Sequence, residues 1–393
     1  MWYMNPDVRA MVEDRFGAFI RDMVNPGVLE RDESAQPLPR EVFREACRLG
    51  MTGFGLPEDV AGAGRDVVSW GRLLEAVGYL CTDSCLPFVV SLRASVIKAI
   101  HRSGCDDLLD RYVVPMVYGT RAPAFAYTDG TYAFSFRTTA TRTSDGYVLE
   151  GEKLFVTGGA TADTFMVYAR AAGSPPSDLQ VFLVERDDPG VEVCPVSLSG
   201  LRSAGISHLR LNRVHVGDRR ALATADGLSH VQRFLNERRI YLACPVLGRM
   251  QAVLEDCIAD LSAKVRYGNS VTAMQNVQAQ IGRMVVCVET ARATLYRALE
   301  HQASPSFDPY WDALGCVAKS YVVDQAIALV QIAQRLLGGD GYLKARHYER
   351  YLRDFCGYIP GGGSQDTLTV DLGVHAISTL GQTPRHPATP PGR

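Results

Sequence analysis

The spacing of apolar residues changes twice along the chain, and the two changes divide it into three parts. From residue 5 to about residue 118, apolar side chains recur at steps of three and four, as in NPDVRAMVEDRFGAFIRDMV (5–24). This period predicts amphipathic helices. The intervening stretch GMTGFGLPEDVAGAGRD (50–66) is rich in glycine and proline, so we expect a loop there. Residues 1–120 are therefore predicted to form an N-terminal all-helical domain.

From about residue 122 the apolar runs become short, β-branched and aromatic. Gly, Asp, Ser and Pro separate them, as between YVLEGEKLFVTGG (147–159) and HLRLNRVHV (208–216). Strands at this spacing predict a small barrel or a sandwich, and we place a middle β-barrel domain at residues 121–225. Two short segments, SDG (144–146) and EGEK (150–153), are typical of tight turns.

After Gly227 the helical period returns and continues nearly to the end of the chain. We expect long helices at about 228–265, 272–301 and 310–337, and a shorter one at about 365–379. Long amphipathic helices with brief connections predict an antiparallel four-helix bundle, here residues 226–382. The proline-rich residues 383–393 are predicted to be a disordered tail. The fold class is thus α+β with three subdomains: helices, a small barrel, and a helical bundle.

Composition narrows the class of protein. The chain has 393 residues, 47% hydrophobic and 21% charged, with a net charge of −2, so we expect a soluble globular protein without a nucleic-acid surface. Its ten cysteines are scattered without a CxxC pair, which favours reduced thiols over a disulfide framework or a metal site. Polar residues interrupt the most apolar helix, at 320–337, and no signal segment is apparent. We therefore expect a cytoplasmic protein that does not span a membrane.

Two segments of the predicted barrel resemble a known family. The run DGYVLEGEKLFVTGGATADTFMVYAR (145–170) is similar, without a gap, to a motif of the acyl-CoA dehydrogenases. The resemblance implies bound FAD, with Thr157 hydrogen-bonded to the reactive edge of the flavin and Phe155 flanking the ring. In AYTDGTYAFS (126–135), Thr128 matches a threonine that contacts the pyrimidine side of the flavin. This loop is shorter than in the family, so thioester recognition is expected to be altered.

Two segments of the predicted bundle extend the resemblance. LSAKVRYGNSVTAMQ (261–275) and QRLLGG (334–339) are similar to family segments that bind the dinucleotide phosphates across a subunit interface. A lysine stands in place of the family arginine and lacks its bidentate fork. The resemblance therefore implies a homodimer or homotetramer. The positions that would bind FAD in this way are Lys264, Arg266, Tyr267, Gln275, Gln334, Gly338 and Gly339.

The catalytic base is where the chain departs from the family. Family members carry E-G-T after an R-D pair, and the glutamate removes a proton from the substrate. Here Arg353-Asp354 is followed by Gly362-Gly363-Ser364, and a one-residue deletion would move the glutamate position to Gly361. Either alignment gives glycine. The backbone N–H of Gly362 can still polarise a thioester carbonyl.

Some members of the family supply the glutamate from the first bundle helix, immediately before an arginine. In FLNERRIYLACPVLG (234–248) that position is Arg238, and Glu237 is one residue, or about 100° of helix, out of register. A local bulge would bring Glu237 back, so it is a candidate base. Asp366 is a further candidate, or else the N-cap of the final helix.

Three neighbouring side chains on this helix are candidate substrate-binding residues. Asn236 and Arg239 match helix positions near the pantetheine arm of the thioester. A buried cation at Arg238 would suit a substrate that bears a carboxylate, a phosphate or a polar head.

The resemblance implies an FAD-dependent oxidoreductase that acts on an acyl thioester, carried by coenzyme A or by an acyl carrier protein. We expect acyl dehydrogenation with hydride transfer to flavin N5, in a specialised biosynthetic pathway, with an electron-transfer flavoprotein or O2 as acceptor. Cyclisation or elimination on a tethered acyl group is an alternative. A flavin monooxygenase, with His347 or His375 near the flavin, is a second alternative. A non-catalytic interaction protein that has lost its cofactor is a third.

Overall fold

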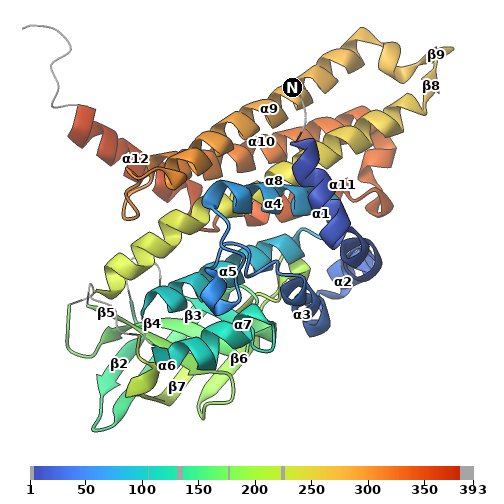
Figure 1. Cartoon of the computed structure of the whole chain (residues 1–393). Helices are drawn as coiled ribbons and strands as arrows, with labels where there is room; N and C mark the ends of the chain where they lie inside the picture. The colour runs from blue at the N-terminus through green and yellow to red at the C-terminus, as the bar shows by residue number, and fades with distance from the viewer. Residues whose placement is uncertain (1–3, 105, 131–135, 176–177, 223–225, 381–393) are drawn as a thin grey trace, which may run out of the picture.

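The computed structural model describes residues 4–104, 106–130, 136–175, 178–222 and 226–380. Helices form both ends of the described chain, and a β-sheet lies between them in sequence. In space the sheet lies at one end of the molecule, and the long helices form a separate layer beside it (Figure 1). The predicted fold class is confirmed.

The N-terminal part consists of short and medium helices around one apolar core. Asn5 caps the first helix, because its side-chain oxygen accepts hydrogen bonds from the backbone N–H groups of Asp7 and Val8. Residues 50–66 form the expected loop, interrupted only by the 3-10 turn η2 (Glu58–Val60). The helical elements are α1 (Pro6–Phe19), the π-helical turn η1 (Ile20–Val24), α2 (Val28–Ser34), α3 (Arg40–Arg48), α4 (Val67–Leu80), α5 (Cys85–Arg102), α6 (Asp106–Leu108), η3 (Leu109–Val113) and α7 (Val114–Val117).

The middle part is a seven-stranded sheet that curls around its own apolar core as a half-barrel. The strands are ordered β1-β4-β2-β3-β7-β6, and β5 pairs with β4. Side chains such as Phe165 and Val167 of β4 and Leu209 and Leu211 of β7 are fully or almost fully buried inside the curl. The strands are β1 (Pro123–Ala126), β2 (Thr139–Arg142), β3 (Gly146–Val156), β4 (Thr164–Ala171), β5 (Leu179–Glu185), β6 (Val191–Pro195) and β7 (Ser207–Gly217).

One of the two predicted turns is wrong. At 144–146 the chain does turn, since the N–H of Thr143 donates to the carbonyl of Gly146. Residues 150–153 instead continue strand β3, and the pairing with β7 shifts register between Leu149 and Gly151. Gly151 has a φ of 145°, and a Cβ there would lie 2.6 Å from the Cα of Thr138. Gly151 therefore lies at an irregularity within strand β3, where the backbone of Thr138 approaches closely.

The C-terminal part contains the long helices that the sequence predicts. Helix α8 runs without a break through Pro245, and a small hairpin, β8–β9, connects it to α9. The elements are α8 (Gly227–Ser262), β8 (Val265–Arg266), β9 (Asn269–Ser270), α9 (Gln275–Ala303), α10 (Ala313–Leu337), α11 (Tyr348–Gly357) and α12 (Gln365–Leu380). Helix α11 was not among the predicted helices.

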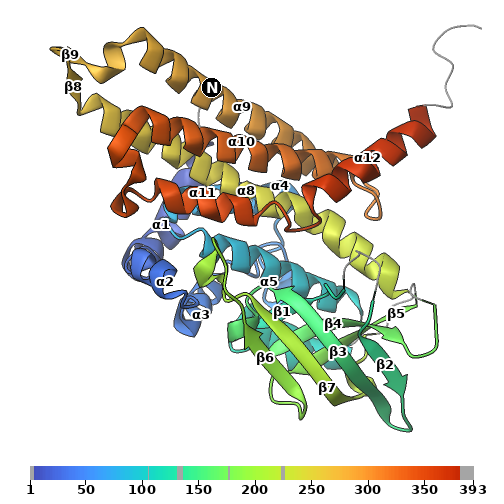
Figure 2. The same ribbon diagram turned by 180° about the vertical axis from the view of Figure 1, so that it is seen from behind.

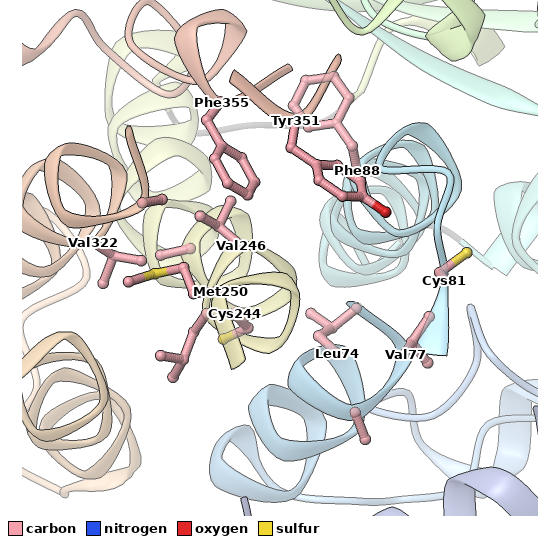
Figure 3. Packing of buried hydrophobic residues seen from close by; sticks show 14 of the residues in the cluster. Leu74, Val77, Cys81, Phe88, Cys244, Val246, Met250, Val322, Tyr351 and Phe355 are labelled. Carbon is pink, nitrogen blue, oxygen red and sulfur yellow. The ribbon is translucent and has the colours of Figure 1, made fainter. Parts of the chain in front are cut away.

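Helix α4, from the N-terminal part, packs against two of the long helices, α8 and α9. Two glycines permit the close contact: a Cβ on Gly78 would lie 2.2 Å from the carbonyl oxygen of Pro245, and one on Gly248 would lie 1.8 Å from that of Glu75. Helix α12, the predicted fourth member, diverges from the bundle (Figures 1 and 2), and Leu368 is its one buried residue. Figure 3 shows side chains of α4, α8, α10 and α11 meeting in the core.

Helix α10 belongs to this core although its composition is strongly apolar. The segment Ala313–Tyr342 is long and apolar enough to cross a membrane, with a mean hydropathy of 1.4 over its most apolar window. Half of that window is buried within the protein, against α8 and α9. Such burial is typical of the core helix of a bundle.

Candidate active site

Two buried cations hold the glycine loop that follows α11. The ammonium group of Lys319, on α10, donates to the carbonyls of Ile359 (2.7 Å) and Gly363 (3.0 Å). Arg239, on α8, donates from Nε to the carbonyl of Gly362 at 2.9 Å. Burial, together with the charge of Arg239, lowers the pKa of Lys319 to about 8. The loop therefore turns three carbonyl oxygens toward positive charge.

Sequence reasoning missed Lys319. The sequence pattern could have identified it, because Lys319 is the one charged residue in the first eleven positions of the apolar helix α10. A fully buried lysine on such a helix needs acceptors nearby.

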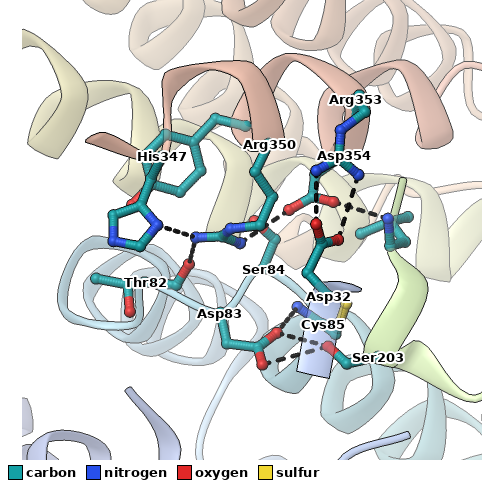
Figure 4. Close-up of polar contacts among 12 residues, drawn as sticks. Asp32, Thr82, Asp83, Ser84, Cys85, Ser203, His347, Arg350, Arg353 and Asp354 are labelled. Carbon is teal, nitrogen blue, oxygen red and sulfur yellow. Dashed lines mark hydrogen bonds and ion pairs between the residues drawn. The ribbon is translucent and has the colours of Figure 1, made fainter. Parts of the chain in front are cut away.

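A polar network anchors α11 and so places the start of the loop (Figure 4). Within α11, Arg350 and Asp354 form an ion pair at 3.1 Å, both almost fully buried. Asp354 also accepts from the backbone N–H of Leu201 at 2.7 Å, and Arg350 donates to the carbonyl of Thr82 at 2.6 Å. Arg353 pairs with Asp32 at 2.6 Å. The R-D pair that marks the family is therefore structural in this chain.

The backbone at Gly362 suits glycine and disfavours a glutamate. Its φ is 70°, in the left-handed region, and a Cβ there would lie 2.8 Å from Cδ1 of Leu242. A side chain at this position would require both strain and displacement of Leu242. Within the described part of the chain, the N–H of Gly362 donates to no acceptor. Its role as a donor to a thioester carbonyl stays a prediction.

Glu237 faces away from the glycine loop, toward α5. Its carboxylate pairs with Arg102 at 2.8 Å, Arg233 at 2.9 Å and Lys98 at 3.4 Å. Burial alone would raise the pKa of this carboxyl, but the charges of Lys98 and Arg102 outweigh burial and lower it to about 2. So acidic a carboxyl is a weak base. The orientation toward α5 and the three ion pairs speak against Glu237 as the catalytic base.

Asp366 does not replace it. It is exposed in the first turn of α12, and Ser364 is the residue that caps the helix, accepting from the N–H of Thr367.

Arg238 lies on the face of α8 that is turned toward the glycine loop. It is 6% exposed, and its guanidinium carbon lies 5.9 Å from the ring centroid of Phe88 on α5. Leu242, one turn further along the same helix face, contacts the loop at Gly362. Burial lowers the pKa of Arg238 to about 10. The position that carries a base in some relatives thus carries a buried cation.

The two other predicted substrate residues bind the protein itself. Asn236 donates to the carbonyl of Pro309 at 3.0 Å, and its side-chain oxygen accepts from Arg239. Arg239 also contacts the sulfur of Cys316 at 3.4 Å. Both ends of the Asn236 side chain are thus engaged within the protein, and the position of Asn236 and Arg239 near the pantetheine arm stays a prediction. Asn236 and Arg239 position the loop.

The predicted flavin-ring residues lie together at one end of the sheet. The N–H of Leu154 donates to the carbonyl of Thr128 at 2.7 Å, which places Thr128 beside Phe155. The Phe155 ring is 60% exposed and Thr157 is half-buried. An exposed aromatic side chain flanked by hydroxyl groups fits a flavin ring. Residues 131–135 of the predicted thioester loop lie outside the described residues.

A buried ion pair that the sequence analysis missed supports this end of the sheet. Lys153 and Asp129 are 2.9 Å apart, and both side chains are almost completely buried. Asp129 also accepts from the backbone N–H of Thr138 at 2.7 Å. The pair ties β3 to the loop after β1, which carries Thr128.

The predicted phosphate-binding residues gather at the other end of the bundle, around β8–β9 and the end of α10 (Figures 1 and 2). A Cβ on Gly338 or Gly339 would meet no atom within 4 Å, so backbone is open there. Lys264 pairs with Asp340 at 2.5 Å, within its own chain. Lys264, Gln334, Gly338 and Gly339 border the turn after α10, and Tyr267 is 96% exposed. The full set of predicted residues is Lys264, Arg266, Tyr267, Gln275, Gln334, Gly338 and Gly339. Open glycine backbone beside cations fits a pyrophosphate.

The two histidines named for a monooxygenase lie apart from the flavin-ring residues. His347 precedes α11 and contacts Arg350, and burial lowers its pKa to about 4. His375 lies on α12 with its ring against Trp311.

These features define a flavin-dependent oxidoreductase of three-domain architecture. Models of the N-terminal, middle and C-terminal acyl-CoA dehydrogenase domains match residues 6–120, 124–214 and 225–374. The chain belongs to the acyl-CoA dehydrogenase family, as the sequence motifs imply. It is a flavoenzyme of that type, with FAD as its cofactor and acyl thioesters as its substrate class.

Individual relatives are distant but span the whole chain. Benzylmalonyl-CoA dehydrogenase of Aromatoleum aromaticum is 29% identical, over 95% of this chain and 98% of its own. The prolyl acyl carrier protein oxidase AnaB has the same fold, with a TM-score of 0.87 at 22% identity, over 95% and 99% of the two chains. Glutaryl-CoA dehydrogenase of Mycobacterium smegmatis, in complex with FADH2, superposes with a TM-score of 0.86 at 24% identity, over 97% and 95%.

Proposed function

We propose that this flavoenzyme dehydrogenates the acyl group of a thioester whose α-proton is already acidic. The observation that carries the proposal is the chemistry of the two family base positions, which here are Gly362 and a buried Arg238. A positioned general base contributes about 10²–10⁴-fold to a proton transfer. A substrate with an acidified α-proton loses least when that contribution is missing.

The residues around the loop supply positive charge and a hydrogen-bond donor. When bound, FAD accepts hydride from the acyl group. In this proposal the N–H of Gly362 donates to the thioester carbonyl, and the contacts of Lys319 and Arg239 with the loop support it, because they fix the backbone that carries this N–H. Positive charge beside that carbonyl stabilises the negative charge that develops on its oxygen as the acidic α-proton passes to water, which takes it in place of a positioned carboxylate.

The assembled enzyme is proposed to be a homodimer or homotetramer. Within one chain, the flavin-ring residues lie on β3 and the loop after β1, whereas the phosphate-binding residues lie around the β8–β9 hairpin and the end of α10, elements that are far apart in Figures 1 and 2. Two copies would complete each other's FAD site. Helix α12 also exposes an apolar stripe of Val370, Val374, Ile377 and Leu380, each 58–76% exposed, which suits burial against another subunit.

The carrier, acceptor and location complete the proposal. We place the enzyme in the cytoplasm, in a biosynthetic pathway, with a thioester of an acyl carrier protein or coenzyme A as substrate. Likeness to the prolyl acyl carrier protein oxidase supports the carrier protein. An electron-transfer flavoprotein or O2 would reoxidise the flavin.

The test is anaerobic mixing of the oxidised protein with a panel of acyl-CoA and acyl-carrier thioesters that differ in α-proton acidity. We expect bleaching of the flavin absorbance, fastest for the most acidic substrates, and a product two hydrogens lighter by mass spectrometry. Thioesters that leave the flavin oxidised and their own mass unchanged would contradict the proposal.

Non-desaturating chemistry, cyclisation or elimination on a tethered acyl group, is the second candidate. It is favoured by the same absence of a carboxylate at both base positions, because neither reaction requires net loss of two hydrogens. An isomeric or eliminated product, formed without lasting flavin reduction, would identify it in the same experiment.

A further inference from the structure

Arg238 differs from the other buried arginines of the described chain. Arg249 donates to the backbone carbonyls of α4 and the residues after it, and Arg350 pairs with Asp354. Arg239 is held by Gly362 and Asn236, and Arg93 donates to Thr161 at 2.9 Å. Among the described residues, Arg238 forms no hydrogen bond and no ion pair, and its Nε is fully buried. Its charge is therefore uncompensated.

The side chain extends toward the region where the acyl group is proposed to react. Arg238 and Leu242 share one face of α8, and Leu242 contacts the loop at Gly362. Phe88 of α5 lies beside the guanidinium of Arg238, and its ring packs against that of Tyr358 with centroids 5.1 Å apart. Arg238 is therefore bounded by aromatic and aliphatic groups and by the glycine loop. These neighbours offer its guanidinium no anion.

Other charged groups in this part of the protein do not compensate the charge of Arg238 either. Lys319 and Arg239 already have backbone carbonyls as acceptors. Asp312 accepts from the N–H of Gly315 and from Gln302, at the start of α10. Glu237 lies on the α5 side of α8 with three cations of its own. An uncompensated cation buried in apolar surroundings is unfavourable unless a ligand supplies the opposite charge.

We propose that Arg238 is a substrate-specificity residue that binds a carboxylate carried by the acyl group of the thioester. The proposal rests on the proposed function, since it assumes that an acyl thioester reaches the glycine loop. A guanidinium matches a carboxylate because two parallel N–H groups meet its two oxygens. A neutral acyl tail would leave the charge unpaired, and a cationic one would be repelled by Arg238, Arg239 and Lys319 together.

The test compares thioesters that differ by a terminal carboxylate alone: succinyl-CoA with butyryl-CoA, and glutaryl-CoA with valeryl-CoA. Dissociation constants are measured by calorimetry and by the change in the flavin spectrum on titration of the FAD-loaded protein. We expect the native protein to bind at least one acidic thioester roughly 100-fold more tightly than its uncharged counterpart. In Arg238→Met we expect this preference to vanish and the uncharged thioester to bind unchanged or more tightly. Arg238→Lys should keep part of the preference, because it keeps the charge and loses the fork.

Arg219→Met is the matched control, because Arg219 is 86% exposed on the middle domain and its loss changes the net charge equally. It should retain the full preference. Each variant must also retain FAD and melt cooperatively, which excludes misfolding as the cause.

The outcomes separate the two proposals. If the native protein binds charged and uncharged thioesters equally, or if Arg238→Met keeps the preference, the carboxylate assignment is overturned and the proposed function stands. If none of these coenzyme A thioesters and no acyl-carrier thioester binds or perturbs the flavin, the proposed function fails, and the role of Arg238 fails with it.

Discussion

Helix α8 presents two consecutive charged residues to opposite kinds of surroundings. On the side that faces α5, Glu237 has three cationic partners within 3.4 Å. On the side that faces the glycine loop, Arg238 has none among the described residues, and the cations beside it are occupied by backbone carbonyls. On the α5 side the charges are therefore paired within the chain, whereas the side that faces the glycine loop carries an unpaired positive charge.

The comparison shows that the carboxylate nearest in sequence to the family base position is poorly suited to accept a proton. Cations close to a carboxylate stabilise its ionised form, so its pKa falls and its basicity falls with it. The arginine beside it lacks any such partner and is well suited to bind an anion. Sequence alone would suggest Glu237 as the proton acceptor, whereas the structure draws attention to Arg238 as an anion-binding residue.

The largest effect is expected when the unpaired cation on the side that faces the glycine loop is replaced by a carboxylate. Arg238→Glu restores the family's helix position for a base, so we expect faster desaturation of an uncharged thioester such as butyryl-CoA, by about 10²-fold. Anaerobic stopped-flow reduction of the flavin measures the rate. Arg238→Gln is the control for loss of charge alone. A rate for Arg238→Glu no higher than that of Arg238→Gln would show that position 238 does not reach the reacting carbon.

Removing the carboxylate on the α5 side should destabilise the fold. Glu237→Gln leaves Lys98, Arg102 and Arg233 clustered without a counter-charge, and we expect a loss of about 3 kcal/mol in the free energy of unfolding at pH 7. The folded pKa of about 2 lies below the unfolded value, so Glu237 stabilises the protein above about pH 4.5.

That contribution disappears as the pH falls toward 2. The difference in denaturant midpoint between the native protein and Glu237→Gln should therefore be complete at pH 6–7 and should narrow below pH 4.5. A difference that stays constant down to pH 3 would contradict the assigned pKa.

Loosening the loop tests whether its cations are structural. Lys319→Met leaves the carbonyls of Ile359 and Gly363 without their donor, and we expect a loss of about 2 kcal/mol. Hydrogen exchange of residues 359–368 should accelerate. Lys344→Met removes an exposed lysine that pairs with Glu33 and serves as the control, with little change expected. Unaltered exchange in the loop would mean that Lys319 does not fix it.

The smallest expected effect is a gain in stability. Arg238→Met replaces an unpaired buried charge with an apolar side chain of similar length, so we expect the ligand-free protein to become more stable by about 1 kcal/mol. Thermal melting measures the change, with Arg219→Met as the neutral reference. Lower stability in Arg238→Met would indicate that Arg238 has a structural partner in the ligand-free protein.

Most elements of the fold could be predicted because each leaves a local period in the sequence. The long helices α8, α9 and α10 and the strands of the half-barrel all followed from apolar spacing of 3.6 or 2. Helix α11 was missed, because its ten residues lie between glycine-rich segments and carry several charges. Arg350 and Asp354 pair within the helix, and the remaining partners come from far away in the chain, such as Asp32 for Arg353 and Leu201 for Asp354.

The sequence by itself determined the family and the cofactor, and it predicted that neither base position carries a carboxylate. The tertiary structure decided where the charges point: Glu237 toward α5, Lys319 into the glycine loop, and Arg238 into apolar surroundings without a partner. It also placed α4, rather than α12, beside the long helices. The physical reason is that a helical or strand period depends on neighbours in sequence. The pKa and the partners of a buried charge depend on groups that packing brings from other elements, such as Lys98 and Arg102 on α5, and no local pattern records them.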